Sequence, residues 1–441
     1  MKVHFIGIGG IGVSALAQFY LEKGHDVSGS DLVASEITDY LKKKGAKIYI
    51  GKHKKENVKK GTELVICSPA VKPENLEYKA AKKLKAKIQT YPEALGDLTK
   101  EYFTIAVSGT HGKSTTTAMI ALALAKADID PTVIIGTKVK EFGGSAEGTN
   151  FRIGTSKVLV IEADEHFSSF LNYWPKIIVL TNIEREHLDH YKNLGNILKT
   201  YKKYVGHLNQ KDCYLVANTD DENIRSTIAE FGENPIFKIE KYGAESPEFS
   251  KIKKIMSVPG KHNVYNALAV VNVARIMAVP DEITYKALSE FEGTWRRFEI
   301  RQGSVSGKKF TLISDYGHHP TEIAATLSAT REKYPKKKIW CVFQPHQHQR
   351  TYYLFKEFVK TFQEALSDNI IITDIYDVAG RETKQINAEV SSEKLVKKIN
   401  KKSVIYLQEN ELEKYIKENI GTGDVLVVMG AGSIYKFAEK F

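Results

Sequence analysis

Short apolar runs alternate with helical patterns from the start of the chain. In the first hundred residues strands are predicted at 3–8, 26–30 and 64–67, together with a helical pattern at 13–23, a lysine-rich helix ending near Gly45 and a helix up to Leu84. Alternation of strands and helices at this spacing is typical of a parallel sheet covered by helices.

The same alternation restarts twice, near residue 100 and near residue 293. In the second part an apolar strand at 103–108 runs into a glycine-rich loop and a helix at 115–127, and further strands are predicted at 157–162, 177–181 and 214–217. In the third part strands are predicted at 310–314, 339–343, 370–373, 403–407 and 425–429. The pattern therefore predicts three successive α/β domains, at residues 1–99, 100–292 and 293–441.

Composition places the chain among ordinary globular proteins, since 42% of its 441 residues are hydrophobic and 27% are charged. Its net charge of +11 comes from scattered lysines, so we expect a solvated basic surface and no nucleic-acid partner. No basic segment or long apolar stretch precedes the first strand, which predicts a cytoplasmic protein without membrane insertion. Cys67, Cys213 and Cys341 show no paired spacing, so neither a disulfide framework nor a zinc site is expected.

A first glycine loop, at residues 7–12, matches the pattern GxGxxG. It follows a strand, opens a helix and is followed by Asp31 at the end of the next strand, which is the context of a nucleotide-diphosphate site. Glycine lets the backbone approach the phosphates, while the helix N-terminus supplies N–H donors. The motif does not identify the nucleotide, and a tight turn that binds nothing remains an alternative.

A second glycine loop, Gly109-Thr110-His111-Gly112-Lys113-Ser114, ends like a phosphate-binding loop, although Val107 occupies the place of the first glycine of a strict Walker A motif. We interpret this loop as an ATP site. Lys113 would pair with the β and γ phosphates, and the hydroxyl of Ser114 would bind Mg²⁺.

Acidic residues and a histidine follow two later strands of the same predicted domain. Glu162 ends one apolar run, and His187 lies in the segment after the next. Because the carboxyl ends of parallel strands meet at one edge of a sheet, Glu162 and His187 are candidate metal ligands near the phosphate loop. Either segment alone would be interpreted as a solvated acidic loop.

The motifs GTHGKST, EADE, TNIExxHLD, HNxxNALA, RRFE, DYGHHPTE and QPHxxxRT occur in this order. With them the chain resembles the Mur ligase family over essentially its whole length, and within it the members that add L-alanine to UDP-N-acetylmuramate. The resemblance implies a Rossmann-like UDP-binding domain, a central P-loop ATPase-type domain with a parallel sheet, and a C-terminal Rossmann-like domain that binds the amino acid. It also implies that ATP activates the muramate carboxylate as an acyl phosphate, which the amine of L-alanine then attacks, as a step of peptidoglycan synthesis.

The resemblance assigns residues to each part of this reaction. The UDP-sugar would contact Gly9, Gly10, Ile11, Gly12, Asp31, Ser68, Pro69 and Ala70. ATP would contact Gly109, Thr110, His111, Gly112, Lys113, Ser114, Thr115, Asn263, Asn266, Arg297 and Asp315, of which Lys113, Arg297 and Asp315 would be catalytic together with Glu162 and His187. Mg²⁺, or Mn²⁺ as an alternative, would bind Ser114, Glu162 and His187, and the amino acid would bind His318, His346 and Arg350. The expected assembly is a monomer or a weak homodimer.

Some residues depart from the family pattern or have a second interpretation. Gln347 follows QPH where members usually carry arginine, so the preference for alanine over glycine or serine stays open, and Glu186 replaces a usual aspartate. Asn263 and Asn266 would be taken for helix-capping residues without the resemblance. The histidines at 318, 319, 346 and 348 fit no standard zinc spacing.

Three other functions compete with this interpretation. A related ligase attaches a preformed tripeptide to the same UDP-sugar, but the QPHxxxRT segment and the run at 375–380 favour the enzyme that adds a single amino acid. An NAD(P)-dependent oxidoreductase would use the first loop and leave Lys113, Glu162 and His187 unexplained. A non-catalytic regulator would bind ATP without substrate-dependent phosphate release.

Overall fold

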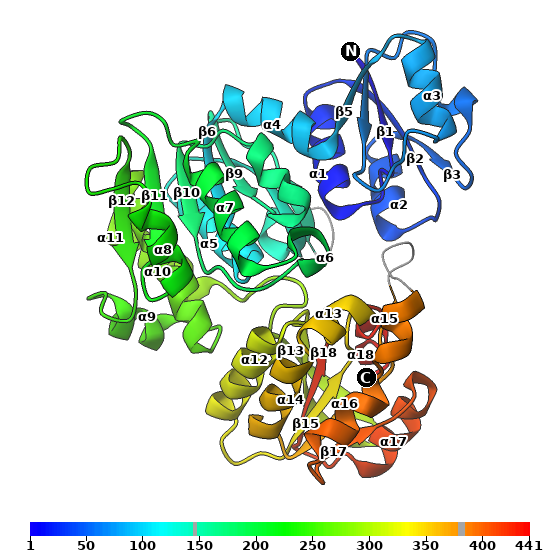
Figure 1. Ribbon diagram of the computed structural model, residues 1–441, viewed down its shortest axis with the longest axis vertical. Coiled ribbons are helices and arrows are strands. Elements are labelled where there is room, and N and C mark those ends of the chain that lie inside the picture. Colours follow the sequence, from blue (N-terminus) through cyan, green and yellow to red (C-terminus); the bar gives the residue numbers. More distant parts are fainter. Residues whose placement is uncertain (144–147, 378–383) are drawn as a thin grey trace. The chain divides into compact units, whose positions relative to one another are not determined.

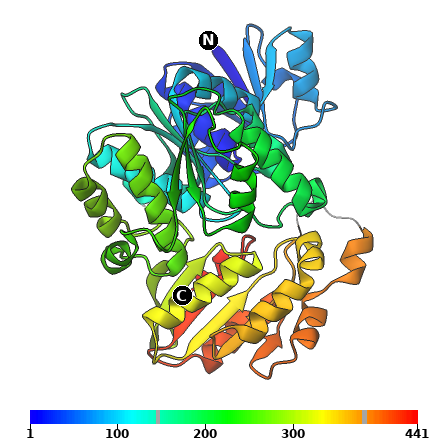
Figure 2. The same cartoon turned by 60° about the vertical axis from the view of Figure 1, so that its left-hand side comes forward.

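The computed structural model describes residues 1–143, 148–377 and 384–441. These residues form three separate β-sheets, each with helices beside it. In Figures 1 and 2 the strands of each sheet run between flanking helices. The predicted fold class of three successive α/β domains is confirmed. None of the helices in the described part of the chain has both the length and the apolar character needed to cross a bilayer.

The first sheet has the strand order β3-β2-β1-β4-β5 within the described residues, and all of its pairs are parallel. Its strands are β1 (Lys2–Ile6), β2 (Asp26–Asp31), β3 (Lys47–Ile50), β4 (Leu64–Cys67) and β5 (Lys87–Thr90), with α1 (Ile11–Glu22), α2 (Glu36–Lys43), η1 (Lys55–Asn57), α3 (Leu76–Lys83) and α4 (Tyr91–Glu101). The strand order reverses between β1 and β4. A crevice at such a reversal is where open α/β sheets bind ligands, and the first glycine loop follows β1 there.

The second sheet has the order β12-β11-β10-β6-β9-β7-β8 within the described residues, and only β8 is antiparallel to its neighbour. Its strands are β6 (Phe103–Ser108), β7 (Thr132–Val139), β8 (Thr149–Arg152), β9 (Val158–Glu162), β10 (Ile177–Leu180), β11 (Tyr214–Asn218) and β12 (Lys238–Tyr242). The helices of this stretch are α5 (Lys113–Lys126), η2 (Lys140–Phe142), η3 (His166–Asn172), α6 (Leu188–Tyr191), α7 (Leu194–Val205), α8 (Glu222–Ala229), α9 (Phe249–Ile255), α10 (Lys261–Ile276) and α11 (Asp281–Glu290). Central strands β6, β9 and β10 are almost fully buried, so both faces of the sheet are covered.

The third sheet has the order β13-β14-β18-β15-β16-β17 within the described residues, with β13 antiparallel at its edge. Its strands are β13 (Glu299–Val305), β14 (Lys308–Asp315), β15 (Ile339–Phe343), β16 (Asn369–Ile372), β17 (Val404–Tyr406) and β18 (Val425–Met429). The helices are α12 (Pro320–Lys333), α13 (His348–Tyr353), α14 (Phe355–Glu364), α15 (Lys384–Glu389), α16 (Ser392–Ile399), η4 (Glu409–Glu411), α17 (Leu412–Asn419) and α18 (Tyr435–Ala438). Of the run at 375–380, Val378, Ala379 and Gly380 lie outside the described residues.

The chain packs as two compact units. The first consists of Met1–Ile183, Leu198–Ser246 and Ala267–Leu288, and the second of Glu184–Ile197, Pro247–Asn266 and Ser289–Phe441. The first unit holds the first two sheets and both glycine loops, and the second unit holds the third sheet and the segment that contains His187.

A fully buried carboxylate fixes the first sheet to its helices. Glu77 of α3 accepts hydrogen bonds from the hydroxyl of Ser30, from Nδ2 of Asn57 at 2.6 Å and from Nε2 of His4 at 3.2 Å. Burial alone would raise the pKa of Glu77, but the hydrogen bonds from His4, Ser30 and Asn57 lower it to about 2. The ionised carboxylate therefore links β1, β2 and α3 inside the domain.

Replacing Glu77 with glutamine is expected to lower the free energy of opening of β1 and β2 by about 2 kcal/mol at pH 7. The folded pKa is depressed, so this stabilisation is complete above the ordinary carboxyl pKa of 4.5 and is lost as the pH falls toward about 2. Amide hydrogen exchange in β1 and β2 at pH 6 and pH 3 would measure it, with the exposed Glu74→Gln as the control. A difference between wild type and Glu77→Gln that stayed the same at both pH values would contradict the prediction.

Candidate functional site

The first glycine loop and its predicted partners lie together at the reversal of the first sheet. The N–H groups of Gly7 and Ile8 donate to the carbonyl of Ser30 at 2.9 and 3.0 Å, and the N–H of Gly9 donates to Oδ2 of Asp31 at 2.8 Å. On the other side the N–H of Ser68 donates to the carbonyl of Ile6 at 2.9 Å. The structure thus brings Asp31 and Ser68 to the loop, as the sequence predicted.

The first turn of α1 is open to a ligand. Its N-cap is Gly10, which offers no side chain to the N–H groups of the turn, and a Cβ on Gly7 would lie 2.9 Å from Cβ of Ser68. Gly7 also has a φ of +80°, which favours glycine. Uncapped N–H groups at a helix N-terminus suit an anion such as a diphosphate.

The second glycine loop joins β6 to α5 in the same unit. Gly109 and Gly112 both have positive φ, and Gly112 is the N-cap of α5. Side chain and backbone of Asn182, which follows β10, hold the loop: its Oδ1 accepts from the N–H of His111 at 2.8 Å and its carbonyl accepts from the N–H of Thr110 at 2.9 Å. This arrangement is the strand, loop and helix that the sequence predicted for a phosphate site.

Lys113 bends back over this loop. Its Nζ donates to the carbonyl of Gly109 at 2.6 Å and pairs with Oε2 of Glu165 at 2.9 Å. Burial would lower the pKa of Lys113, but the carboxylates of Glu165, Asp164 and Glu162 outweigh it and raise the pKa above its usual value. Glu165 was not predicted from the sequence as the partner of Lys113, although it lies in the EADE run.

Two oxygen-bearing side chains that suit a hard metal ion lie in contact beside the loop. The hydroxyl of Ser114 donates to Oε1 of Glu162 at 2.9 Å, and Oε2 of Glu162 accepts from the N–H of Gly136 at 2.8 Å. Burial is the largest cause of the raised pKa of Glu162. A hydroxyl and a carboxylate next to a phosphate loop fit Mg²⁺, which prefers oxygen ligands. The third predicted ligand, His187, belongs to the second unit.

Replacing Glu162 with glutamine is expected to raise the Mg²⁺ concentration for half-maximal nucleotide binding at least about tenfold, because a neutral amide is a poor ligand for a hard divalent cation. Titration of Mg²⁺ against the affinity for a non-hydrolysable ATP analogue would measure the change. Glu101→Gln, an exposed substitution at the end of α4, is the control. An unchanged Mg²⁺ requirement in Glu162→Gln would show that Glu162 is not a ligand of the metal ion.

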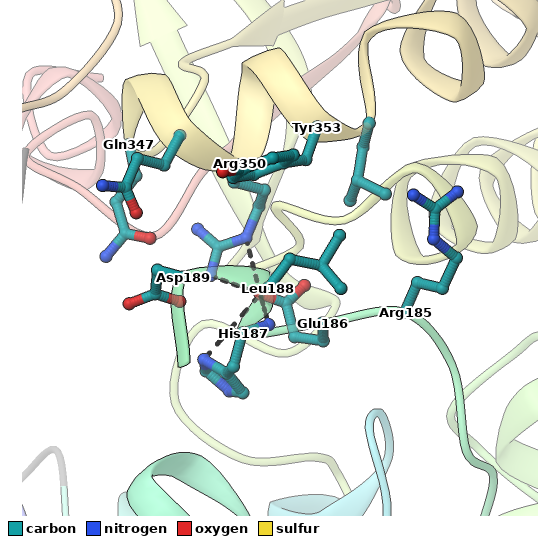
Figure 3. Close-up of a pocket in the computed structure, with 10 residues that line it drawn as sticks. Arg185, Glu186, His187, Leu188, Asp189, Gln347, Arg350 and Tyr353 are labelled. Carbon is teal, nitrogen blue, oxygen red and sulfur yellow. Dashed lines mark hydrogen bonds and ion pairs between the residues drawn. The ribbon is translucent and has the colours of Figure 1, made fainter. Parts of the chain in front are cut away.

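In the second unit a pocket is formed by two segments (Figure 3). Its lining residues are Arg185, Glu186, His187, Leu188 and Asp189 from one segment and Gln347, Gln349, Arg350, Tyr353 and Leu354 from the other. His187 has a φ of +53° and Gln347 a φ of +71°, which are unusual for residues other than glycine. Backbone strain of this kind clusters at functional sites.

A buried ion pair joins the two sides of this pocket. Nε and Nη2 of Arg350 lie 3.0 and 2.8 Å from Oε1 of Glu186, and Nη1 of Arg350 donates to the carbonyl of His346 at 2.9 Å. Burial would raise the pKa of Glu186, but Arg350 above all, with His187 and His319, holds it well below the usual value. From the sequence Glu186 was only a departure from the family pattern, and its pairing with Arg350 was not predicted.

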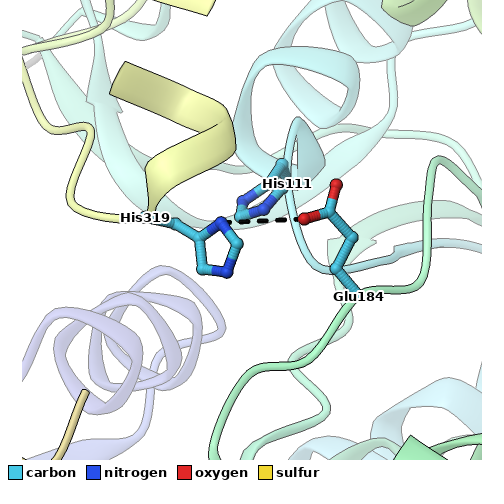
Figure 4. Close-up of side chains that lie close together, drawn as sticks. All are labelled: His111, Glu184 and His319. Atoms are coloured by element: carbon cyan, nitrogen blue, oxygen red, sulfur yellow. Dashed lines mark ion pairs between the residues drawn. The ribbon is translucent and has the colours of Figure 1, made fainter. Parts of the chain in front are cut away.

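The three residues predicted to bind the amino acid lie close to one another. His346 lies within 3.0 Å of Nη1 of Arg350 through its Nδ1, and the rings of His318 and His346 are 6.0 Å apart. Burial, followed by the charge of Arg350, lowers the pKa of His318 to about 3, so His318 is neutral at physiological pH. His319 caps α12, and its Nδ1 lies 3.7 Å from Oε2 of Glu184. Figure 4 draws this ion pair as a dashed line.

The residues predicted to reach ATP from other segments have structural partners of their own. Asp315 ends β14 and accepts from the N–H groups of Phe298 and Gly317 at 2.8 and 2.7 Å, while Nη1 of Arg297 lies 3.2 Å from Oε1 of Glu322. Asn263 lies inside the first turn of α10 and donates to the carbonyl of Pro259 at 2.7 Å, so it is not the N-cap that the capping interpretation required. Their roles toward ATP stay predictions.

Comparison with known proteins gives matches along the whole chain. Models of the Mur ligase family match in order: its catalytic domain at residues 2–103, its middle domain at 107–274 and its glutamate ligase domain at 296–432. A curated relative, UDP-N-acetylmuramate–L-alanine ligase of Clostridium botulinum (strain Loch Maree), is 40% identical over 458 residues, covering 100% of this chain and 97% of the relative.

Solved structures match as well. UDP-N-acetylmuramate-alanine ligase of Thermotoga maritima aligns with a TM-score of 0.78 and 29% identity, covering 100% of this chain and 98% of the other. A murein peptide ligase of Psychrobacter arcticus aligns with a TM-score of 0.71 over 100% and 98% of the two chains, but at 23% identity it is evidence for the fold alone.

Proposed function

The chain belongs to the Mur ligase family, and we propose that it joins L-alanine to the carboxylate of UDP-N-acetylmuramate, with ATP converted to ADP and phosphate. The product would be UDP-N-acetylmuramoyl-L-alanine, the first peptide-bearing precursor of peptidoglycan. The observation that carries this proposal is the full-length identity of 40% with a relative named for this reaction. The phosphate loop with Lys113, Ser114 and Glu162 supports the dependence on ATP.

The residues of the chain have distinct tasks in this reaction. The glycine loop and the open first turn of α1 bind the diphosphate of the UDP-sugar, with Asp31 and Ser68 beside them. Lys113 binds the phosphates of ATP and neutralises the charge of the phosphoryl group that passes to the muramate carboxylate. Ser114 and Glu162, with His187 proposed as a third ligand, would hold Mg²⁺, which would supply further positive charge for the phosphates.

The amino acid is proposed to bind in the pocket of the second unit. Arg350 would orient the carboxylate of L-alanine, since its planar guanidinium suits that group. His318 is neutral at physiological pH, so it adds no second positive charge beside Arg350. The amine of L-alanine attacks the acyl phosphate, the new amide bond forms and phosphate leaves.

Further parts of the proposal concern boundaries, location and assembly. We place the domain junctions near residues 100 and 293, the reaction in the cytoplasm where ATP and nucleotide-linked sugars are present, and the protein in a monomeric or weakly dimeric state. Mn²⁺ is proposed as a substitute for Mg²⁺, because both ions accept oxygen ligands in octahedral geometry.

Phosphate release from ATP with Mg²⁺ and UDP-N-acetylmuramate tests the function, with alanine, glycine, serine and the tripeptide offered one at a time. Release that strongly prefers alanine is expected. Preference for the tripeptide would identify a recycling ligase instead. Preference for glycine or serine would support the same reaction with a different amino-acid specificity. Absence of substrate-dependent release would favour the non-catalytic regulator.

A further inference from the structure

Tyr91 lies at the start of the helix that connects the first two sheets. It is the first residue of α4, which begins with a capping box: the N–H and the hydroxyl of Thr90 both donate to Oε2 of Glu93, at 2.7 and 2.9 Å. A capped first turn holds the backbone of Tyr91 in one conformation. The position of its side chain is therefore well determined by the fold.

One edge of the Tyr91 ring packs against Gly12 at the end of the first glycine loop. A Cβ on Gly12 would lie 2.9 Å from Cζ and 3.0 Å from the hydroxyl oxygen of Tyr91, so only glycine leaves room for the ring. Gly12 is the second residue of α1, in the turn whose N–H groups are open to a diphosphate. The phenol therefore lies directly beside the proposed diphosphate site.

Tyr91 also lies near carboxylates at the end of a strand of the second sheet, which belongs to the same unit. Burial, and after it the carboxylates of Glu162 and Asp164, raise the pKa of Tyr91, which places the phenol near the end of β9. Helix α4 is held against the segment after these carboxylates, because a Cβ on Gly96 would collide with the backbone carbonyl of Asn172. Tyr91 thus packs against Gly12 and is near enough to Glu162 and Asp164 to respond to their charges.

Among the described residues the hydroxyl of Tyr91 makes no hydrogen bond, and the contact with Gly12 is a packing contact of the ring. The side chain is half-buried, and its oxygen is not among the buried polar atoms that lack a hydrogen bond. A polar atom that is accessible, rigidly placed and unpaired is available to a ligand.

We propose that the hydroxyl of Tyr91 donates a hydrogen bond to the UDP-sugar substrate, in the part that runs from the diphosphate toward the carboxylate to be activated. This inference rests on the proposed function. The diphosphate binds at the first turn of α1, whereas the carboxylate must reach the phosphates of ATP near Lys113 and Glu162. The substrate must therefore pass from Gly12 toward β9, and Tyr91 occupies that interval.

The phenol is suited to this contact because it stays protonated at physiological pH and donates without adding charge. UDP alone ends at the diphosphate, so it lacks the part of the substrate that the hydroxyl is proposed to contact. The proposed contact should therefore strengthen binding of the complete substrate but not of UDP, and this difference can be measured.

The test compares the dissociation constants of UDP and UDP-N-acetylmuramate for Tyr91→Phe, with Mg²⁺ and a non-hydrolysable ATP analogue present. Phenylalanine keeps the ring against Gly12 and removes only the hydroxyl. We expect Kd for UDP-N-acetylmuramate to rise about tenfold, since a hydrogen bond between a neutral donor and a charged or polar acceptor contributes on this scale. Kd for UDP should stay within about twofold of wild type.

Tyr102→Phe is the matched control, because Tyr102 is the half-buried C-cap of the same helix and contacts the ring of Phe19. It should change neither constant. Equal affinities of wild type and Tyr91→Phe for both ligands would overturn the inference, and so would an equal loss for UDP and the complete substrate, which would indicate a packing role. Failure of the wild type to bind UDP-N-acetylmuramate more tightly than UDP would overturn the proposed function itself.

Discussion

Lys113→Ala is expected to lower the turnover number at least about a thousandfold while leaving the affinity for UDP-N-acetylmuramate within about twofold. Lys113 is the cation of the second glycine loop, where its Nζ lies 2.6 Å from the carbonyl of Gly109. The UDP-sugar is proposed to bind at the first loop, which belongs to a different sheet. Steady-state phosphate release and a direct binding titration with UDP-N-acetylmuramate would measure the two effects separately.

The control must separate lost chemistry from damaged structure, because Lys113→Ala leaves the buried Glu165 without its ion-pair partner. Lys113→Met, which keeps much of the stem volume, should lose turnover to the same extent. Lys126→Ala, at the exposed end of the same helix, should retain it. Loss of UDP-sugar binding in Lys113→Ala, or turnover close to wild type, would contradict the assignment of the two loops.

The sequence located both glycine loops because their signals are local. An apolar strand, a glycine turn and a helix follow within about twenty residues, and parallel topology brings the ends of neighbouring strands to one edge. Hence Asp31 was expected near the first loop and Glu162 near Ser114, whereas Ser68 was expected at the first loop from the family resemblance. The three-domain fold class was predicted from the repeated alternation of strands and helices, and the family from the ordered motifs.

The strands that the sequence did not predict are mainly edge or near-edge strands. β3 and β5 each have no buried residue, and β12 and β13 are largely polar or exposed, so they have no apolar run to recognise. β8 is a four-residue edge strand. β7 is different, because most of its side chains are buried and its apolar run was present in the sequence but overlooked.

Side-chain partners distant in sequence could not be predicted for a physical reason. Glu186 and Arg350 are 164 positions apart, and no periodicity relates a loop after one sheet to a helix of another. Tyr91 was missed likewise, since its importance comes from the closeness of Gly12 and not from a motif. Such contacts follow from tertiary packing, which a single sequence encodes only indirectly.

Arg350→Lys is expected to lower kcat/KM for L-alanine about a hundredfold, with the KM for ATP nearly unchanged. In the structure all three guanidinium nitrogens of Arg350 are engaged: Nε and Nη2 with Glu186, and Nη1 with His346. A lysine ammonium is a single point charge and cannot hold Glu186 and the carbonyl of His346 while it also donates to a substrate carboxylate. Initial rates at varied L-alanine and fixed UDP-N-acetylmuramate would measure the change.

Arg331→Lys provides the matched control, because Arg331 also forms an arginine–carboxylate pair, with Asp368 at 2.7 Å, in the same unit. That substitution should leave the kinetics unaltered. An unchanged KM for L-alanine in Arg350→Lys would mean that the pair with Glu186 only stabilises the pocket, and the amino-acid carboxylate would then need another cation. A selective rise in that KM would instead show that one arginine, positioned by Glu186, is sufficient where Gln347 replaces the second arginine of the family pattern.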